Sequence, residues 1–193
     1  MLDLLQALDH RLFFFVNNGW SCGPLDDVFV GLSELGGWTI ALVAAFVLAT
    51  DGRRRFLRHA LVVACFLILA SATNNIIKDT VDRSRPLKKF DAEIEAGTVR
   101  VNYLEAGSLR HRSFPSGHSM LAFFLMTYLG QARRAMRPFA LALAAGIALS
   151  RVYVGAHFPL DCIGGAAVGA AWALLAAWAL TRLDRRIPQP APA

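Results

Sequence analysis

The stretch ALVVACFLILASATNNII, residues 60–77, contains no charged side chain in 18 residues. A second stretch, CIGGAAVGAAWALLAAWALT at residues 162–181, extends over 20 residues and is also uncharged. A helix of about 20 apolar residues spans the hydrocarbon core of a bilayer. The two stretches therefore predict transmembrane helices and decide how the rest of the chain is interpreted.

Three shorter uncharged runs cover residues 35–50, 119–132 and 138–150. Each of them alone could be a core helix of a soluble protein. Beside two runs of membrane length, they are interpreted as spans that are tilted or that begin or end in functional polar residues. The helix that contains the first of these runs is expected to extend from residue 28 to residue 50, with Gly36–Gly37 as a candidate break. Five spans result.

The composition supports this class of protein. Of 193 residues, 55% are hydrophobic and 18% are charged, against about 25% charged in average globular chains. Residues 1–18 place leucines at helical spacing among Asp3, Asp9 and Arg11, which indicates an amphipathic helix in the membrane interface more than a span. The predicted fold is an all-α integral membrane bundle of about six helices. One domain covers residues 1–187, and the Pro-rich residues 188–193 form a disordered tail.

The five spans place the connecting segments alternately on the two sides of the membrane. Residues 51–59, residues 131–138 and the tail from residue 182 share one side, and residues 51–59 are expected to be a loop. Residues 78–117 and 151–161 share the other. Lys and Arg divide evenly between the sides, but short basic loops favour the first as cytoplasmic. The net charge of +6 is thus explained by the membrane topology and by attraction to anionic lipid, and no nucleic-acid partner is expected.

Three polar clusters lie at the ends of the spans on the predicted outer side. They are KDTVDRSRP at residues 78–86, PSGH at 115–118 and SRVYVGAHFPLD at 150–161. Ionisable groups at the ends of membrane spans are costly and point to function. Because topology can bring the three clusters together, they predict one shared site.

The residue types in these clusters suit a phosphate group. Lys78, Arg85 and Arg151 supply three cations, and Arg in particular matches phosphate geometry. Ser116 and Gly117 stand just before a predicted helix, whose first amides are unpaired and favour anions. The clusters therefore predict a phosphate cradle.

Two histidines and a carboxylate add reactivity to this cradle. His157 and Asp161 are four residues apart, so one helical turn would let the carboxylate hold one imidazole nitrogen and raise the basicity of the other. Such a histidine can attack phosphorus. His118 is then free to give a proton to the leaving group. His10, His59 and His111 are interpreted as ordinary interface residues.

The three clusters together resemble the type 2 phosphatidic-acid phosphatase superfamily of membrane lipid phosphatases. The family pattern is Lys-x6-Arg-Pro, then Pro-Ser-Gly-His, then Ser-Arg-x5-His-x3-Asp, and all of it is present between Lys78 and Asp161. The resemblance implies that His157 forms a phosphohistidine, that Asp161 orients it and that His118 is the acid. It also implies that the phosphate is bound by Lys78, Arg85, Ser116, Gly117 and Arg151, that no metal or other cofactor is needed and that the chain forms a bundle of about six helices.

The small size resembles bacterial members of the family, which implies an inner-membrane enzyme, and the topology predicted from the basic loops places its active site toward the periplasm or the cell exterior. Substrates of such bacterial members are phosphatidic acid, phosphatidylglycerol phosphate, lipid A or a polyprenyl diphosphate, and we lean slightly to undecaprenyl diphosphate. Residues 87–114 are expected to set much of the choice. A homodimer through Gly165 and Gly169 is less favoured than packing of these glycines inside the bundle.

Three alternatives share some of these features. Vanadium-dependent haloperoxidases carry the same motifs, but they are soluble, and the apolar runs argue against them. A lipid phosphotransferase, which passes the phosphoryl group to another lipid, fits the motifs as well as a hydrolase does. A non-catalytic lipid-binding or transport protein would not need the pairing of a nucleophile with an orienting carboxylate.

Overall fold

The structure is a computed structural model that describes residues 2–105 and 110–186, without the side chains of residues 2, 38–42, 44–55 and 185–186. Within these ranges every regular element is a helix, which confirms the predicted all-α fold. The elements are α1 (Leu2–Asn17), α2 (Gly23–Val81), α3 (Pro86–Lys89), α4 (Asp91–Glu95), α5 (Gly117–Ala132), η1 (Arg134–Met136), α6 (Arg137–Tyr153) and α7 (Pro159–Arg186). The predicted tail, residues 188–193, lies outside the described residues.

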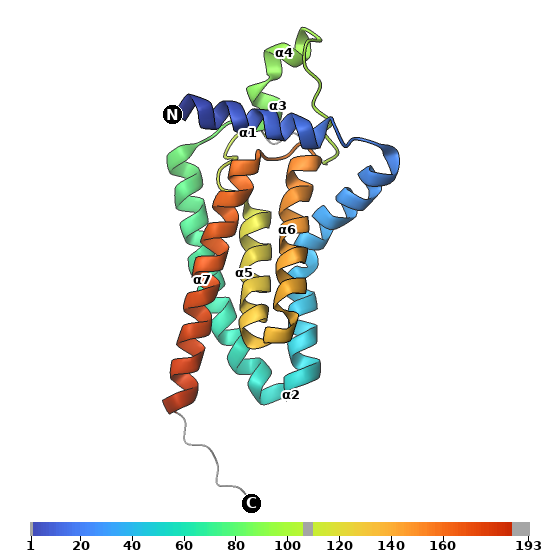
Figure 1. Cartoon of the computed structure of the whole chain (residues 1–193). Helices are drawn as coiled ribbons and strands as arrows, with labels where there is room; N and C mark the ends of the chain where they lie inside the picture. Colours follow the sequence, from blue (N-terminus) through green and yellow to red (C-terminus); the bar gives the residue numbers. More distant parts are fainter. Residues whose placement is uncertain (1, 106–109, 187–193) are drawn as a thin grey trace, which may run out of the picture.

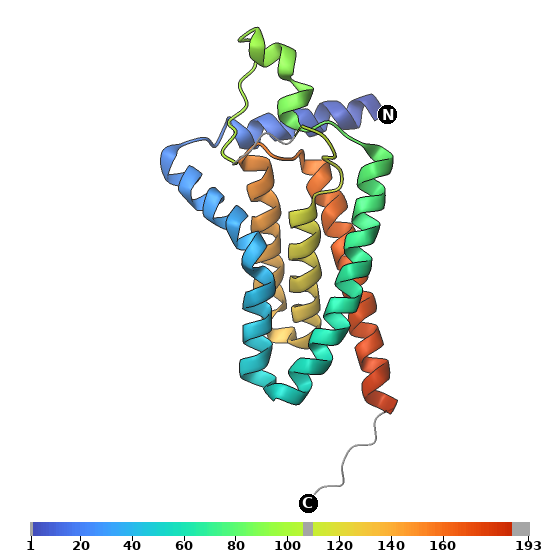
Figure 2. The same ribbon diagram turned by 180° about the vertical axis from the view of Figure 1, so that it is seen from behind.

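Helix α2 contains two of the predicted spans. Its 59 residues are helical throughout, and the ribbon turns back at the lower end of the molecule as drawn in Figures 1 and 2. The predicted loop at residues 51–59 is therefore wrong, as is the proposed break at Gly36–Gly37. Residues 51–59 contain no proline, and arginine is a good helix former, so the segment stays helical despite the unfavourable Gly52. The helix also begins before residue 28, at Gly23, with Pro24 in its first turn.

Helix α5 is the centre of the bundle, with α2, α6 and α7 packed around it. The side chains of Ala122, Phe124 and Leu125 are at most 1% exposed. With 16 residues, α5 is about 24 Å long, shorter than a typical hydrocarbon core. Neighbouring helices, more than lipid, therefore surround this helix.

Two glycines of α7 allow it to lie directly against α5. A Cβ atom at Gly165 would overlap the carbonyl oxygen of Ser116, and one at Gly169 would overlap that of Met120. Small residues at this spacing let two helix backbones approach closely. The predicted packing of this pair inside the bundle is confirmed.

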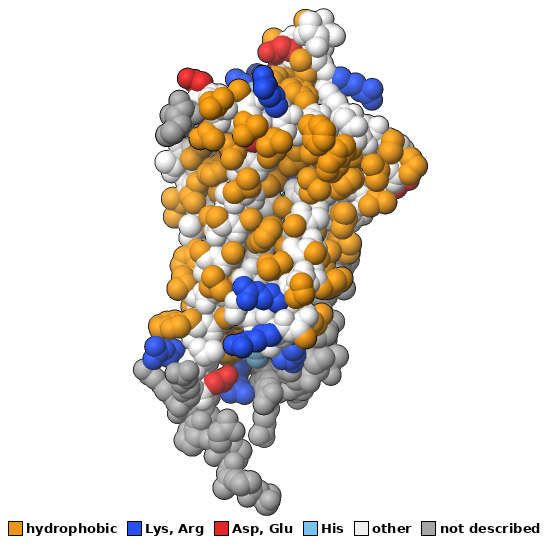
Figure 3. Space-filling model, in the orientation of Figure 1, with side chains coloured by type: hydrophobic (Ala, Val, Ile, Leu, Met, Phe, Trp, Pro, Cys, Tyr) orange, Lys and Arg blue, Asp and Glu red, His pale blue; other side chains and the backbone are white. Residues whose placement is uncertain are grey.

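The outer surface of the bundle is apolar. On α2, α6 and α7, the large hydrophobic side chains that are more than 55% exposed are Leu57, Leu61, Ile68, Ile76, Phe139, Ile163 and Trp178. On the face drawn in Figure 3, hydrophobic side chains cover most of the surface between the two ends. Contiguous exposed apolar surface of this extent is typical of contact with lipid.

Three described segments are long and apolar enough to cross a membrane, namely Phe56–Glu95, Arg134–Tyr153 and Pro159–Asp184. Helix α5 is shorter than such a segment, and the side chains of residues 44–50 in the first part of α2 lie outside the description. The number of five spans therefore stays a prediction.

Helix α1 lies across the upper end of the bundle and does not run along it (Figure 1). Leu4, Leu8 and Phe15 are exposed, as an interfacial helix requires. In an amphipathic helix the polar residues are expected to face water, but Asp9 and Asn17 of α1 are buried against the bundle. The Asn17 side chain donates to the carbonyl oxygens of Asn102 and Tyr153 at 2.8 and 2.7 Å and anchors the end of α1.

Candidate active site

The predicted site residues all come from segments that meet at the upper end of the bundle, where α2 ends, α5 begins, α6 ends and α7 begins (Figure 1). Lys78 is in the last turn of α2, Arg85 caps α3, and Arg151 is in the last turn of α6. Ser116 caps α5 and is followed by Gly117 and His118. His157 lies between α6 and α7, and Asp161 is in the first turn of α7.

The Asp161 carboxylate is buried and faces His157. Its Oδ2 atom lies 3.6 Å from His157 Nδ1, an ion-pair distance that is long for a hydrogen bond. The same oxygen accepts from Ser113 Oγ at 2.5 Å and from the Phe158 amide at 2.9 Å. Ser113 Oγ is also 3.3 Å from His157 Nδ1. Because Nδ1 faces these groups, Nε2 is the ring nitrogen left for chemistry.

The turn that presents His157 precedes α7 and is not part of it, in contrast to the predicted helical turn. The amides of Ala156 and His157 both donate to the carbonyl oxygen of Arg151 at 3.1 Å, which ends α6. Gly155 has φ +78°, and a Cβ there would press against the carbonyl oxygen of Asn102. Glycine is therefore required at residue 155, since other residues rarely adopt this conformation and would not fit.

Burial lowers the pKa of the His157 imidazole to about 4, and the nearby Asp161 carboxylate only partly offsets this effect. The positive charges of Arg85 and Arg151 lower the pKa further. Near neutral pH the ring is therefore uncharged, with a lone pair on one nitrogen. A nucleophile needs that lone pair.

The three predicted cations are held in place by the backbone or by neighbouring side chains. Arg85 Nε donates to the His111 carbonyl oxygen at 3.1 Å, and Lys78 Nζ donates to that of Arg112 at 2.9 Å. Arg151 Nη1 donates to Ser33 Oγ. These fixed positions keep the cations aimed at one region, where the charges of Arg151, Arg85 and Lys78 all act on the His118 ring.

Ser116 and Gly117 are used differently from each other at the start of α5. The Ser116 amide donates to the Asp161 carbonyl oxygen at 2.8 Å, so this amide cannot also donate to a phosphate. The Ser116 hydroxyl caps the helix by accepting from the Ser119 amide at 3.4 Å. The Gly117 amide is at the first helical position, where no acceptor exists within the helix. Of the two predicted amides, Gly117 is thus the one placed to meet an anion.

A cavity of about 270 Å³ lies beside these groups and is lined by Ser33, Glu34, Glu105, His118 and Arg151, among others. Glu105 Oε1 accepts from Arg151 Nη2 at 2.6 Å. Gly36 of α2 packs against the His118 ring, where a Cβ would come within 3.2 Å of Cδ2. Helix α2 therefore forms one wall of the cavity, and its glycine gives the His118 ring room.

The sequence did not single out three residues that contact the predicted site residues, nor a fourth that binds one of these three. Ser113 and Arg83 donate to Asp161, Glu105 binds Arg151, and Asp9 binds Arg83 at 2.5 Å. Arg83 and Ser113 lie close in sequence to Arg85 and Pro115, which is the one signal that could have indicated them. Asp9 gave no such signal, because an aspartate on a leucine-rich helix is expected to face water.

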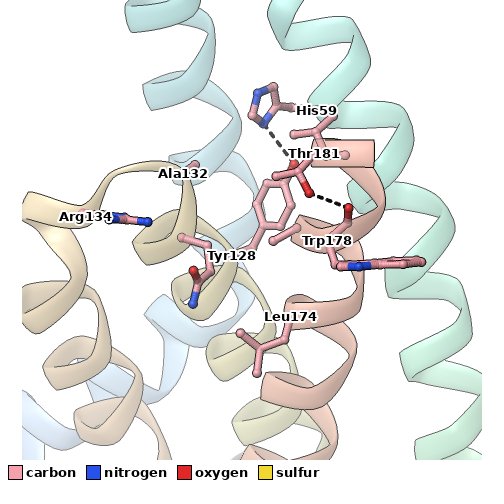
Figure 4. A pocket seen from close by; sticks show the side chains of 10 residues that line it. His59, Tyr128, Ala132, Arg134, Leu174, Trp178 and Thr181 are labelled. Atoms are coloured by element: carbon pink, nitrogen blue, oxygen red, sulfur yellow. Dashed lines mark hydrogen bonds between the residues drawn. The ribbon is translucent and has the colours of Figure 1, made fainter. Parts of the chain in front are cut away.

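A second pocket, of about 340 Å³, lies near the lower end between α2, α5 and α7. Figure 4 shows its lining, with Tyr128 and His59 turned toward each other and their hydroxyl oxygen and Nδ1 atoms 2.9 Å apart. Among the described residues that line it there is one histidine, and none is an aspartate or a glutamate. It lacks the pairing of nucleophile and carboxylate, so we assign the chemistry to the upper end.

Comparisons with known proteins show the family to which the chain belongs. The sequence pattern of the PAP2 superfamily matches residues 59–185. Phosphatidylglycerophosphatase B of Bacillus subtilis is 26% identical over 160 residues, which cover 75% of this chain and 70% of that protein. Decaprenylphosphoryl-5-phosphoribose phosphatase of Mycobacterium tuberculosis is 34% identical over 145 residues, 72% of each chain.

Solved structures show the same fold. The crystal structure of Aquifex aeolicus LpxE superposes with a TM-score of 0.67 at 26% identity and covers 88% of this chain and 94% of that one. A transmembrane PAP2-type phosphatidylglycerolphosphate phosphatase from Bacillus subtilis gives a TM-score of 0.67 at 23% identity, over 96% of this chain and 89% of that one. Together with the apolar helices, these matches establish that the chain belongs to the PAP2 superfamily and is an integral membrane lipid phosphatase of that type.

Proposed function

We propose that the protein removes a phosphoryl group from a lipid phosphate or lipid diphosphate through a covalent phosphohistidine on His157. The observation that carries this proposal is the buried arrangement of His157 and Asp161, with Nδ1 facing the carboxylate at 3.6 Å. A site that only binds a lipid would not need a buried histidine oriented by a carboxylate.

The proposed reaction has two steps. In the first, His157 Nε2 attacks phosphorus, the bond from phosphorus to the leaving oxygen breaks, and His118 gives that oxygen a proton. In the second, water attacks phosphorus, the bond from phosphorus to His157 Nε2 breaks, His118 takes a proton from the water, and inorganic phosphate leaves. Asp161 stabilises the positive imidazole ring that exists between the two steps.

Five groups are proposed to bind the phosphate oxygens: Lys78, Arg85, Ser116, Gly117 and Arg151. The three cations offset its negative charge, and the Gly117 amide stands at the start of a helix, where anions are favoured. Because Ser116 uses its amide for Asp161, its hydroxyl is the group available for phosphate. No metal enters this scheme, since the protein's own cations can stabilise the transferring group.

The test is phosphate release by the purified protein from a panel of lipids. The panel contains phosphatidic acid, phosphatidylglycerol phosphate, lipid A and undecaprenyl diphosphate, the last being the substrate toward which we lean. His157→Ala should abolish release and the acid-labile phosphate found on the protein after rapid quench. His111→Ala, a change of an exposed histidine at the same end, is the control and should stay active. Persistence of the adduct in His157→Ala would contradict the mechanism, and phosphate passed to a second lipid would indicate a transferase.

We also assign the protein to the bacterial inner membrane, with the upper end facing the periplasm or the cell exterior. The support is the arginine-rich lower end, because short basic segments favour the cytoplasm. Single cysteines placed at Glu93 and Arg134, in a variant without the native cysteines, should report this in whole cells. A membrane-impermeant maleimide should label residue 93 and not residue 134, and the reverse pattern would overturn the orientation.

A further inference from the structure

We propose that Arg83 and Asp9 are positioning residues for the reaction, forming with Asp161 and His157 a buried chain of four side chains that reaches from the nucleophile to helix α1. This inference rests on the proposed function, because it assigns roles relative to a nucleophilic His157. It gives α1 a part in catalysis that an interfacial helix would not otherwise have.

The chain is continuous at hydrogen-bond distances beyond Asp161. Arg83 Nη1 donates to Asp161 Oδ1 at 2.6 Å, and Arg83 Nη2 donates to Asp9 Oδ2 at 2.5 Å. The side chains of both aspartates are fully buried, and that of Arg83 is 21% exposed. Buried carboxylates that share one guanidinium in this way have little freedom to move.

Arg83 completes the contacts of the Asp161 carboxylate. Oδ2 receives Ser113 and the Phe158 amide, and Arg83 occupies Oδ1. The guanidinium also lies over the Phe158 ring, 4.4 Å from its centroid. Since Phe158 follows His157 directly, Arg83 fixes both the carboxylate and the backbone that carries the nucleophile.

Asp9 links this chain to the start of α7. Its Oδ1 atom accepts from the Leu160 amide at 2.8 Å, next to Asp161 in the sequence. One carboxylate of α1 thus holds the guanidinium and the helix start together. A displacement of Asp9 would therefore reach Asp161 by two routes.

The charges suggest why a second carboxylate is present. Arg83 alone would neutralise Asp161 and weaken its attraction for the positive ring of the phosphohistidine. Asp9 returns the sum of Asp9, Arg83 and Asp161 to one negative charge, so the guanidinium can orient Asp161 without cancelling its charge. Loss of Asp9 should accordingly affect the covalent step more than the binding of substrate.

The experiment compares kcat, KM and thermal stability of the full-length protein in detergent, with phosphatidic acid or the best substrate of the panel. The variants are Asp9→Asn, Arg83→Gln, Arg83→Lys and the double variant Asp9→Asn/Arg83→Gln. Asn17→Ala is the matched control, because Asn17 is buried on the same helix and anchors it without touching Arg83. It should lower the melting temperature and leave kcat within about twofold of wild type.

Asp9→Asn and Arg83→Gln should each lower kcat by about 10- to 100-fold, the scale of a small misplacement of a reacting group, with KM changed by less than about threefold. The double variant should be no slower than Arg83→Gln, because asparagine keeps an oxygen for the Leu160 amide, so that Asp9→Asn interrupts only the route through Arg83. Arg83→Lys should recover little, since one ammonium cannot bridge both carboxylates as the fork does.

Two outcomes would overturn the proposal: losses that multiply in the double variant, or an Asn17→Ala variant that loses as much kcat as Asp9→Asn. The second would mean that α1 matters through stability alone. Failure of the proposed function would give a different result. Turnover and phosphoprotein would then persist in His157→Ala, whatever the kinetics of the Asp9 variants.

Discussion

Glu105 binds Arg151, one of the proposed phosphate-binding residues, so replacement of Glu105 by glutamine is expected to tighten the binding of phosphate-like anions. Glu105 Oε1 accepts from Arg151 Nη2 at 2.6 Å, and Arg151 Nη1 is bound to Ser33. Arg151 Nε and Glu105 Oε2 are buried and lack a hydrogen-bond partner among the described residues. A phosphate that uses Nε must therefore lie beside a carboxylate of like charge.

The size of the effect follows from the distance and the burial. Two unit charges about 6 Å apart repel by roughly 3 kcal/mol at an effective dielectric constant near 20. Because the Glu105 side chain is 23% exposed, water screens part of this repulsion, which leaves about 1–3 kcal/mol. Glu105→Gln should then lower the inhibition constant of orthovanadate by roughly 5- to 150-fold. Glutamine keeps an oxygen for Arg151, so the guanidinium stays in place.

The assay is inhibition of lipid phosphate hydrolysis by orthovanadate, measured for wild type, Glu105→Gln and Glu34→Gln. Glu34 lines the same cavity but is more exposed, so its variant should shift the inhibition constant by less than about twofold. An unchanged or higher inhibition constant in Glu105→Gln would refute the reasoning. It would mean that the charge of Glu105 orients Arg151 for phosphate and does not compete with phosphate.

Other predictions concern the acid, the nucleophile, the metal and the packing. His118→Ala should lose about 10²–10⁴-fold in kcat/KM on a lipid monoester and much less on an aryl phosphate, whose leaving group hardly needs a proton; equal losses would remove His118 as the acid. Burial lowers the pKa of His157 to about 4, so the ring is protonated and inactive only below about that pH. The acid limb of kcat/KM should thus fall well below pH 6.5, and a limb at 6.5 or above would contradict this. Excess EDTA should leave activity intact, whereas a loss restored by magnesium would contradict a metal-free reaction. Gly169→Leu should prevent stable folding, checked by melting temperature, because a side chain there overlaps the Met120 carbonyl oxygen.

The sequence predicts the helical fold well because uncharged runs leave few alternatives to helices in a membrane. It fails at residues 51–59, where basic residues suggested a loop. At the end of a bundle, long cationic side chains can reach water from a helix, so charge alone does not mark where a helix stops. The sequence also fails at α1, where polar residues were expected to face water. Asp9 and Asn17 are buried instead, because hydrogen-bond partners inside the protein satisfy them.

The candidate site is predictable in its motifs and not in its supporting contacts. The three clusters converge because each adjoins the end of a span on one side of the membrane, which topology alone dictates. Contacts such as Ser113 with Asp161, 48 residues apart in sequence, depend on the path of the segment before α5. The link from Asp9 to Arg83 depends on how α1 crosses the bundle, which no local pattern encodes.

The packing of α5 against α7 connects the fold to the chemistry. Gly165 brings the two backbones together at Ser116, and at that contact the Ser116 amide reaches the Asp161 carbonyl oxygen at 2.8 Å. Ser116 begins the helix that carries Gly117 and His118, whereas Asp161 faces His157, the proposed nucleophile. The spacing between the proposed phosphate cradle and His157 therefore depends on a glycine contact inside the bundle as well as on the polar contacts of the site. Because that contact is backbone to backbone, it leaves little room for adjustment, so His118 and His157, the proposed acid and nucleophile, are held at a fixed separation before any substrate arrives.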